Sequence, residues 1–546
     1  MLRILDLNAP LDATPDDLLD LALKKTRIPA AEVRHFRLCR RAIDARDKAR
    51  VHAVCSLELS LFVDEEKAAA RSPYKRVAVE APAEVVEFRR FSDSGSSNLG
   101  PRPVVVGAGP AGLFAALALA EAGQRPIVLE RGQKVQRRRK DVRQFFATGE
   151  LDTESNVQFG EGGAGTFSDG KLNSGIRRDR FTRRVFTSLV EAGAPEAILW
   201  EAKPHIGTDL LTGVVERLRG QIEALGGEFL FGHRLVDLVI NGGALQALKV
   251  ASPGGARLRI DAQSAFLCLG HSARDTFEAL LQRGVTLTPK PFSIGVRVEH
   301  PQQLINESQY GRLFASHPAL GAADYKLAVH LPGARSAYTF CMCPGGRVVA
   351  AASEAGGVVT NGMSEFARDQ VNANAALLVG LSPQDFGQTH PMAGVAFQRR
   401  FERLAFEMGG RHFGAPAQRV GDFLKGRASK RLGKVEASYR PHVVPGDLTR
   451  CLPRFAADAL RQAIVLLDRR LRGFALPDAV MTGVETRSSS PVRIERGDDM
   501  QCVGLLGLYP CGEGAGYAGG ITSSAADGLR AAWAFLTRGQ SGAVGA

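Results

Sequence analysis

The chain has 546 residues, a length that predicts about three domains, and its hydrophobic content of 45% is that of a globular protein. No apolar run reaches the roughly 18 residues of a membrane-spanning helix, and the first residues lack the layout of a signal peptide. Eight cysteines without a CxxC pair predict reduced thiols in a cytoplasmic protein, whereas the net charge of +13 leaves RNA open as a partner.

Residues 1–95 are predicted to form a separate α/β module. Residues 43–50 read as a charged connection, and the polar stretch 92–101, rich in glycine and serine, is typical of a linker. We therefore expect the module to fold independently. The expected elements are strands at 2–5, 51–61 and 85–91 and a helix at 16–25 after Thr14-Pro15.

The segment from Val104 to Glu130 carries the pattern of a dinucleotide-binding unit. A β-branched strand at 104–106 is followed by glycines in a GxGxxG pattern, a buried helix at 113–122 and a second strand at 126–129. The glycines allow a tight turn, a close approach of a pyrophosphate and close helix packing, and a carboxylate after the second strand suits a ribose diol. The predicted contacts are Gly107, Gly109, Pro110, Ala111, Gly112, Glu130 and Arg131.

The same glycine pattern recurs at 160–165 and 514–519, but without a matching strand, helix and acid. Neither recurrence predicts a second nucleotide-binding unit. The densest basic cluster, Arg137-Arg-Arg-Lys140, lies between these segments. It could meet the phosphates of a nucleotide or of RNA, or it could be a solvated helix face.

The glycine-rich stretch 155–172 predicts backbone that passes close to a flat or phosphorylated molecule. Gly165, Ser168 and Lys171 are the predicted cofactor contacts, and Lys171 is also a candidate catalytic residue as a cation near the cofactor or a substrate carboxylate. The alternative is a turn at Asp169-Gly170 with Lys171 in solvent.

Residues 204–288 return to the pattern of the nucleotide-binding unit. A helix is expected at 208–225 and strands at 228–231 and 235–240, where Val236 is a predicted cofactor contact. A core strand at 264–269 ends at Gly270, a further predicted contact. His271 follows at the carboxyl end of that strand, where ligands bind in open α/β sheets, so it is a candidate general acid or base. The alternative is a histidine that only hydrogen bonds a nearby carbonyl.

Residues 289–484 are predicted to form an inserted lobe, because strands and loops alternate from Pro291 onward. Cys341-Met-Cys343 lies on one of these strands. Since alternate residues of a strand face opposite sides, the two thiols are predicted to diverge. We therefore expect two small buried hydrophobic side chains and no dithiol chemistry.

Residues 485–538 are predicted to complete the nucleotide-binding domain. Arg487 could anchor an anionic substrate between the lobes or form an interdomain salt bridge. A last buried strand runs into Gly512-Glu513, and a helix is expected from Ile521 to Trp533. The predicted cofactor contacts here are Gly512, Glu513, Gly519, Gly520 and Ile521.

In this order and spacing the segments 104–130, 266–271 and 509–521 resemble the FAD-binding domain of glutathione-reductase-like flavoproteins. The chain most closely resembles uncharacterised FAD-dependent dehydrogenases that carry an N-terminal α/β module and a GEGGAGTFSDGKL segment, which stands here at 160–172. The resemblance implies an α/β fold with a Rossmann-like FAD domain of glutathione-reductase type, formed by 99–288 and 485–538, and an inserted α+β substrate lobe. It also implies non-covalent FAD, with Glu513 on the ribityl chain and the helix at Ile521 facing the flavin ring.

The sequence thus predicts a cytoplasmic FAD-dependent oxidoreductase that moves a hydride between the flavin and a small molecule, which could be anionic, held between the lobes. No metal site is predicted. NAD(P)H as an electron donor would have to share the substrate cleft, because the sequence has one nucleotide-binding unit. Two alternatives are a flavoprotein that acts on RNA and a non-catalytic FAD-binding redox sensor or scaffold.

Overall fold

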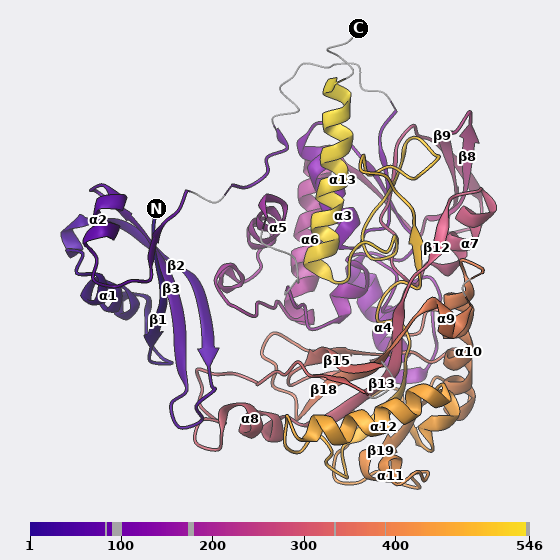
Figure 1. Cartoon of the computed structure of the whole chain (residues 1–546). Helices are drawn as coiled ribbons and strands as arrows, with labels where there is room; N and C mark the ends of the chain where they lie inside the picture. Colours follow the sequence, from indigo (N-terminus) through magenta and orange to yellow (C-terminus); the bar gives the residue numbers. More distant parts are fainter. Residues whose placement is uncertain (82–83, 90–100, 173–178, 332–334, 388, 542–546) are drawn as a thin grey trace.

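The computed structural model describes residues 1–81, 84–89, 101–172, 179–331, 335–387 and 389–541. Most of the predicted linker, 92–100, lies outside the described residues. Three sheets organise the chain: one in the N-terminal module, a parallel sheet, and a larger sheet in the lobe (Figure 1). The mixed α/β fold predicted from the sequence is therefore confirmed. Within the described ranges, no helix is long and apolar enough to cross a membrane.

The N-terminal module is a four-stranded sheet with two helices. It differs from prediction in two added strands, β2 (Val33–Asp44) and β4 (Val77–Val79), and in the segment expected as a strand at 85–91. Strand β2 was not predicted, because two bulges in its pairing with β3 interrupt the alternation of apolar and polar residues. Residues 84–88, expected as a strand, instead run as irregular chain whose Phe88 packs 5.9 Å from the ring of Trp533. The other elements are β1 (Leu2–Ala9), α1 (Pro15–Thr26), β3 (His52–Leu61), α2 (Glu65–Arg71) and β4 (Val77–Val79), in the sheet order β2-β3-β1-β4.

The module also touches the rest of the chain. The Arg41 N–H donates to the Trp200 carbonyl at 2.8 Å, and the Ala202 N–H donates back to the Arg41 carbonyl at the same distance. The β2–β3 hairpin extends toward helix α8 (Gln302–Tyr310), where Lys48 contacts the Gln309 carbonyl (Figure 1). Independent folding of the module therefore stays a prediction.

The five-stranded parallel sheet has the order β23-β11-β5-β6-β7. The helix after β5, α3 (Pro110–Glu121), is buried all round, as its apolar sequence predicted, and it packs against α13 (Ile521–Ser541). Gly112 lets α3 lie close to the turn after β5, because a Cβ there would stand 1.8 Å from the Gly107 carbonyl oxygen. The strands are β5 (Val104–Val106), β6 (Ile127–Glu130), β7 (Glu228–Phe231), β11 (Ala265–Leu267) and β23 (Leu508–Pro510).

Four helices and an antiparallel three-stranded sheet complete this unit. The predicted helix at 208–225 is confirmed as α6, and the strand predicted at 235–240 is confirmed as β8. The elements are α4 (Val135–Thr148), α5 (Arg180–Glu191), α6 (Thr208–Ala224), α7 (Arg274–Gln282), β8 (Arg234–Asn241), β9 (Ala244–Ala251) and β10 (Arg257–Asp261).

The lobe contains a seven-stranded sheet, β14-β15-β18-β13-β21-β19-β20, in which only β19 and β20 run parallel. Helix α12 packs on it over a large apolar core (Figure 1). Its elements are β13 (Phe292–Pro301), α8, β14 (Ala328–His330), β15 (Ser336–Cys343), the hairpin β16 (Arg347–Ala350) and β17 (Thr360–Met363), β18 (Asn372–Leu381), α9 (Pro383–Phe386), α10 (Ala393–Met408), β19 (Ala415–Arg419), α11 (Val420–Leu424), β20 (Val443–Pro445), α12 (Arg454–Asp468) and β21 (Val480–Glu485).

The chain passes between the parallel-sheet unit and the lobe twice. Strand β12 (Leu287–Pro289) pairs with β22 (Val492–Ile494), so both belong with the parallel sheet. The boundaries expected from the sequence, 288/289 and 484/485, each fall inside a strand. We therefore propose crossings at 290–291 and 486–491.

Candidate functional site

A cavity of about 420 Å³ lies at the carboxyl ends of the parallel strands, and its far wall comes from the lobe sheet. This is where ligands bind in open α/β sheets. Most of the residues predicted as cofactor contacts line it: Gly107, Gly109, Pro110, Ala111, Glu130, Arg131, Gly165, Ser168, Lys171, Gly270, Glu513, Gly519, Gly520 and Ile521. Three do not. Leu235 lines the cavity in place of Val236, while Gly112 and Gly512 lie behind the wall.

The glycine loop leaves open space where a phosphate would bind. A Cβ on Gly109 would meet only the Gly163 Cα, at 3.8 Å, so this side of the backbone is free. Gly109 is also the N-cap of α3, and Pro110 occupies the first turn. The N–H groups of the first turn and the positive end of the helix dipole therefore face this space, which is the arrangement that binds a pyrophosphate.

Glu130 organises the glycine loop as well as facing the cavity. Its carboxylate accepts hydrogen bonds from the backbone N–H groups of Ala108 (2.8 Å), Gly132 (2.8 Å) and Gly160 (3.0 Å). A carboxylate has about four acceptor sites, so one remains for a ribose hydroxyl. Arg131 is held by ion pairs to Glu154 and Asp275, at 2.8 and 2.9 Å.

The basic cluster at 137–140 divides into two kinds of side chain. Arg137 is exposed and pairs with Asp141 on its own helix. Arg138 is fully buried and donates to the carbonyls of Asn156, Val157, Gly160 and Glu161. Its guanidinium therefore fastens the glycine-rich segment to α4, and burial lowers its pKa to about 10. It is not free to bind phosphates.

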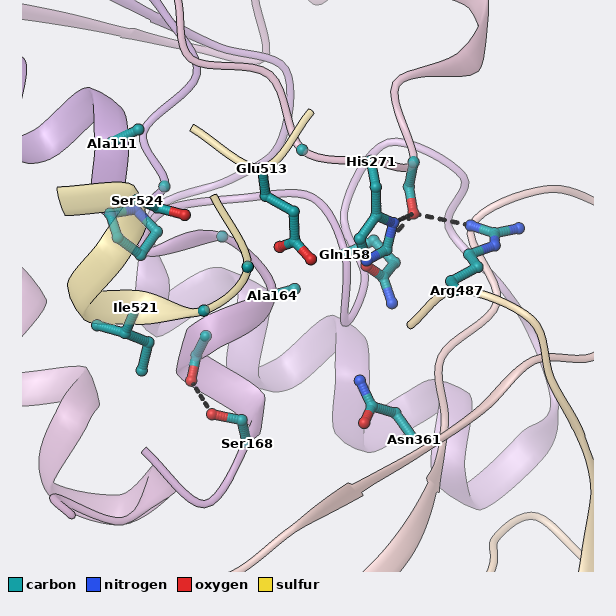
Figure 2. Close-up of a pocket in the computed structure, with 18 of the residues that line it drawn as sticks. Ala111, Gln158, Ala164, Ser168, His271, Asn361, Arg487, Glu513, Ile521 and Ser524 are labelled. Carbon is teal, nitrogen blue, oxygen red and sulfur yellow. Dashed lines mark hydrogen bonds between the residues drawn. The ribbon is translucent and has the colours of Figure 1, made fainter. Parts of the chain in front are cut away.

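The segment 160–172 meets the first glycine loop. The Gly162 N–H donates to the Ala108 carbonyl at 2.8 Å, and Ser168 Oγ donates to the Gly165 carbonyl at 2.6 Å, a bond drawn in Figure 2. The predicted turn at Asp169-Gly170 is present, with Gly170 at φ +68°. Lys171 is not in solvent: its Nζ is buried 3.4 Å from Asp169 and makes no hydrogen bond within the described residues. Asp169 itself pairs with Arg368.

Glu513 projects into the cavity between Ile521 on one side and His271 on the other (Figure 2). Burial raises its pKa to about 7, and Lys290 offsets this only in part. A Cβ on Gly270, Gly519 or Gly520 would touch nothing, so the backbone around the acid is open. A flat ring and a hydroxylated chain fit here, with the first turn of α13 facing them.

His271 belongs to a buried network at the other end of the cavity. Ser272 Oγ lies 3.0 Å from His271 Nδ1 and accepts a hydrogen bond from Arg487 (Figure 2). Burial and the charges of Arg487 and Arg274 lower the pKa of His271 to about 3. The imidazole is therefore neutral near pH 7, which makes it a poor general acid. The hydrogen-bond partner of His271 is the Ser272 hydroxyl, whereas the alternative considered from the sequence was a backbone carbonyl.

Of the two roles left open for Arg487, the structure shows the interdomain ion pair for its guanidinium fork. The fork binds both oxygens of Glu402, at 3.1 and 2.9 Å, and its remaining nitrogen donates to Ser272 and Ser353. Glu402 also accepts two bonds from Arg274, at 2.8 and 2.9 Å. Because these side chains are buried, the network fixes the lobe against the parallel-sheet unit.

The expectation that Cys341 and Cys343 diverge is wrong. A bulge in β15 between Phe340 and Cys343 interrupts the alternation of side chains, the Cys343 thiol donates to the Cys341 carbonyl at 3.3 Å, and the two thiols shift each other's pKa. Cys341 lines the cavity.

Sequence reasoning missed the charged group behind this wall. Arg297 is fully buried, pairs with Glu485 at 2.5 and 2.8 Å and donates to the cavity residue Asn361. In the sequence, this buried charge was indicated by a single arginine within the apolar strand 292–298.

Comparisons with known proteins agree with this geometry. Residues 102–153 match the FAD binding domain, 291–488 match "FAD-dependent protein, C-terminal domain-like", and 1–60 match a domain of unknown function. An uncharacterised protein of Clostridium beijerinckii is 45% identical over 533 residues, which cover 97% of this chain and 98% of that protein. The predicted cofactor, FAD, is thereby confirmed.

Solved structures are more distant. A geranylgeranyl bacteriochlorophyll reductase-like protein from Thermoplasma acidophilum is 12% identical, with 81% of this chain and 79% of that chain covered and a TM-score of 0.37. The glycerol-3-phosphate dehydrogenase from Bacillus halodurans, complexed with FAD, is 10% identical, with 83% and 66% covered and a TM-score of 0.35.

Proposed function

Because the chain belongs to a family of FAD-dependent proteins, we propose that it is an oxidoreductase that moves a hydride between non-covalent FAD and a small molecule in the cavity. One observation carries the proposal: a single cavity joins the phosphate cradle at Gly109 to residues of the lobe, Cys341 and Asn361 among them. A cofactor held on one wall would therefore meet a substrate held on the other.

In this proposal the parallel-sheet unit holds FAD in the manner of glutathione-reductase-type domains. The N–H groups at the start of α3 bind the pyrophosphate, and Glu130 uses its remaining acceptor site for the adenosine ribose. Glu513 accepts from the ribityl hydroxyls. Bound FAD supplies a ring that takes up or releases a hydride, and the positive end of α13 stabilises the negative charge of its reduced form.

The lobe side would bind the substrate. The lobe contributes the cation Lys326 and the amide of Asn361 to the lining, and Lys171 of the glycine-rich segment adds a second cation, so an anionic small molecule fits the proposal best. The buried network of Arg487 and Glu402 holds this wall in place and excludes water behind it. We place the protein in the cytoplasm because its eight cysteines are free.

The test is anaerobic stopped-flow reduction of the protein-bound flavin. NADH, NADPH and a panel of small anionic metabolites are mixed in turn with the holoprotein, and bleaching of the flavin absorbance is followed. NAD(P)H would share the cavity with the substrate. At least one donor should reduce the flavin in a reaction that saturates with donor concentration. A bound flavin that no donor reduces, in a protein whose partner binding changes with redox state, would favour a sensor instead.

A further inference from the structure

The bulge in β15 brings two cysteine side chains together. On β18 the register advances by two residues, from Ala376 to Asn374, whereas on β15 it advances by three, from Phe340 to Cys343. The extra residue and the positive φ of Cys341, +42°, break the alternation that would set the two thiols on opposite faces. The Cys343 thiol donates to the Cys341 carbonyl oxygen at 3.3 Å, and the two thiols are close enough to shift each other's pKa.

The two thiols differ in their access to the cavity. Cys341 is partly exposed and lines it, whereas Cys343 is fully buried and does not. A reagent in the cavity would therefore reach Cys341 first. Cys343, which is buried away from the cavity, is placed to react second, with Cys341.

Charged groups of both signs surround Cys341: Lys171 lies 3.4 Å from Asp169, and Arg297 is paired with Glu485. The Lys171 ammonium is buried nearby without a hydrogen bond inside the described residues, and Arg297 donates to the Cys341 carbonyl at 2.8 Å. Three carboxylates also face the site. Asp169 is paired with Arg368, and Glu485 is paired with Arg297. Glu513 is paired with neither of these arginines.

The hydrogen bond from Cys343, followed by the Lys171 charge, lowers the pKa of Cys341 well below its usual value. The same contact raises the pKa of Cys343. This contact therefore favours a thiolate on Cys341, the sulfur that faces the cavity, over one on Cys343.

We propose that Cys341 and Cys343 form a redox-active dithiol that reduces a low-molecular-weight disulfide entering the cavity. The Cys341 thiolate attacks one sulfur of the substrate, RSSR, whose S–S bond breaks to release RS⁻. The released thiolate takes the proton of Cys343. The Cys343 thiolate then attacks Cys341 Sγ, and the second RS⁻ leaves and takes a proton from solvent. The pair ends as a disulfide and RSSR as two thiols, a transfer of two electrons.

Return of the pair to the dithiol rests on the proposed function. Reduced FAD would supply two electrons to break the Cys341–Cys343 bond, and one proton to Cys343 would restore the starting pair of a Cys341 thiolate and a Cys343 thiol. This step makes a disulfide the substrate class of the flavoprotein. The other neighbouring thiols, Cys268 and Cys511, follow adjacent parallel strands. Cys268 lines the cavity and Cys511 is fully buried with a raised pKa, so this pair has the same access from a different wall, and C511S is the matched control.

The experiment uses the full-length protein, with and without FAD, in glutathione redox buffers. After acid quenching and alkylation, mass spectrometry of peptides measures the Cys341–Cys343 disulfide. We expect this disulfide to form in the wild type and in C511S. In C343S, which lacks the second thiol, we expect a stable mixed disulfide between glutathione and Cys341.

Alkylation rates give a second readout that does not need flavin. Near neutral pH, iodoacetamide should modify Cys341 at least about tenfold faster than Cys39, a partly exposed thiol whose pKa burial raises to about 11. Equal rates at the two cysteines, or no intramolecular disulfide in the most oxidising buffer, would overturn the proposal. If FAD binds and is reduced but the disulfide never forms, the dithiol proposal is refuted and the proposed function stands. If the disulfide forms but the flavin is never reduced, the proposed function is refuted and the dithiol stands.

Discussion

Replacing Glu513 with glutamine should make the stability of the apoprotein less dependent on pH. Burial raises the pKa of this carboxyl to about 7 in the folded protein, whereas the unfolded chain has the ordinary value near 4.5. Between these values the folded state binds the proton and the unfolded state does not. The Glu513 contribution to the free energy of unfolding is therefore complete below the unfolded pKa and is lost as pH rises through the folded one.

The magnitude follows from the size of the shift, which corresponds to about 3 kcal/mol between roughly pH 4.5 and pH 7. Glutamine has nearly the same shape and cannot ionise. The difference in free energy of unfolding between E513Q and the wild type should thus grow by about 2–3 kcal/mol across this window in favour of E513Q, and then level off.

Urea unfolding of flavin-free protein at several pH values across this window measures the difference. E407Q is the matched control, because Glu407 is exposed on α10 and its substitution should give the same difference at every pH. A difference for E513Q that does not change with pH would refute the reasoning, and one that grows in the opposite direction would place Glu513 beside a cation that the structure does not show.

Two further predictions concern the joints of the fold. Glu402→Ala leaves Arg274 and Arg487 buried without their shared acid and should lower the free energy of unfolding in urea by about 3–5 kcal/mol. The control E278A breaks an exposed ion pair and should lower it by less than about 1 kcal/mol. Equal losses in the two variants would contradict the interdomain network. A chain that starts at residue 98 should still bind FAD, but it should be about 3 kcal/mol less stable than one that starts at 84, because it lacks the buried Phe88 and Val86. Loss of FAD binding in the chain that starts at 98 would show that the module does not fold apart from the cofactor site.

The nucleotide-binding unit could be predicted because its signals are local. Strand, glycine loop, helix and acid follow one another between Val104 and Glu130, and each has a separate physical requirement. The position of the cavity followed from the same rule, since the carboxyl ends of parallel strands meet at one edge of a sheet. Neither inference needed contacts between residues distant in the sequence.

The features that could not be decided from the sequence share one cause, which is that contacts between residues distant in the chain determine them. Nothing near Arg487 in the sequence indicates that Glu402 will take its guanidinium fork, because the acid comes from α10 of the lobe. The bulge that joins Cys341 and Cys343 depends on pairing with β18, and a plain strand pattern predicts the opposite. Arg138 looked like one of several surface charges until the carbonyls of the glycine-rich segment surrounded it.

The most direct test of the account is titration of the flavin-free protein and its Gly109→Val variant with FAD. Gly109 has φ −76°, which valine adopts, and open space beside it, so the substitution should leave the fold intact while it fills the place of the pyrophosphate. We expect one FAD per wild-type chain, released intact when the protein is unfolded. We expect G109V to keep the thermal stability of the wild type and to bind no FAD. A wild-type chain that takes up no FAD, or a G109V variant that binds it equally well, would contradict the account.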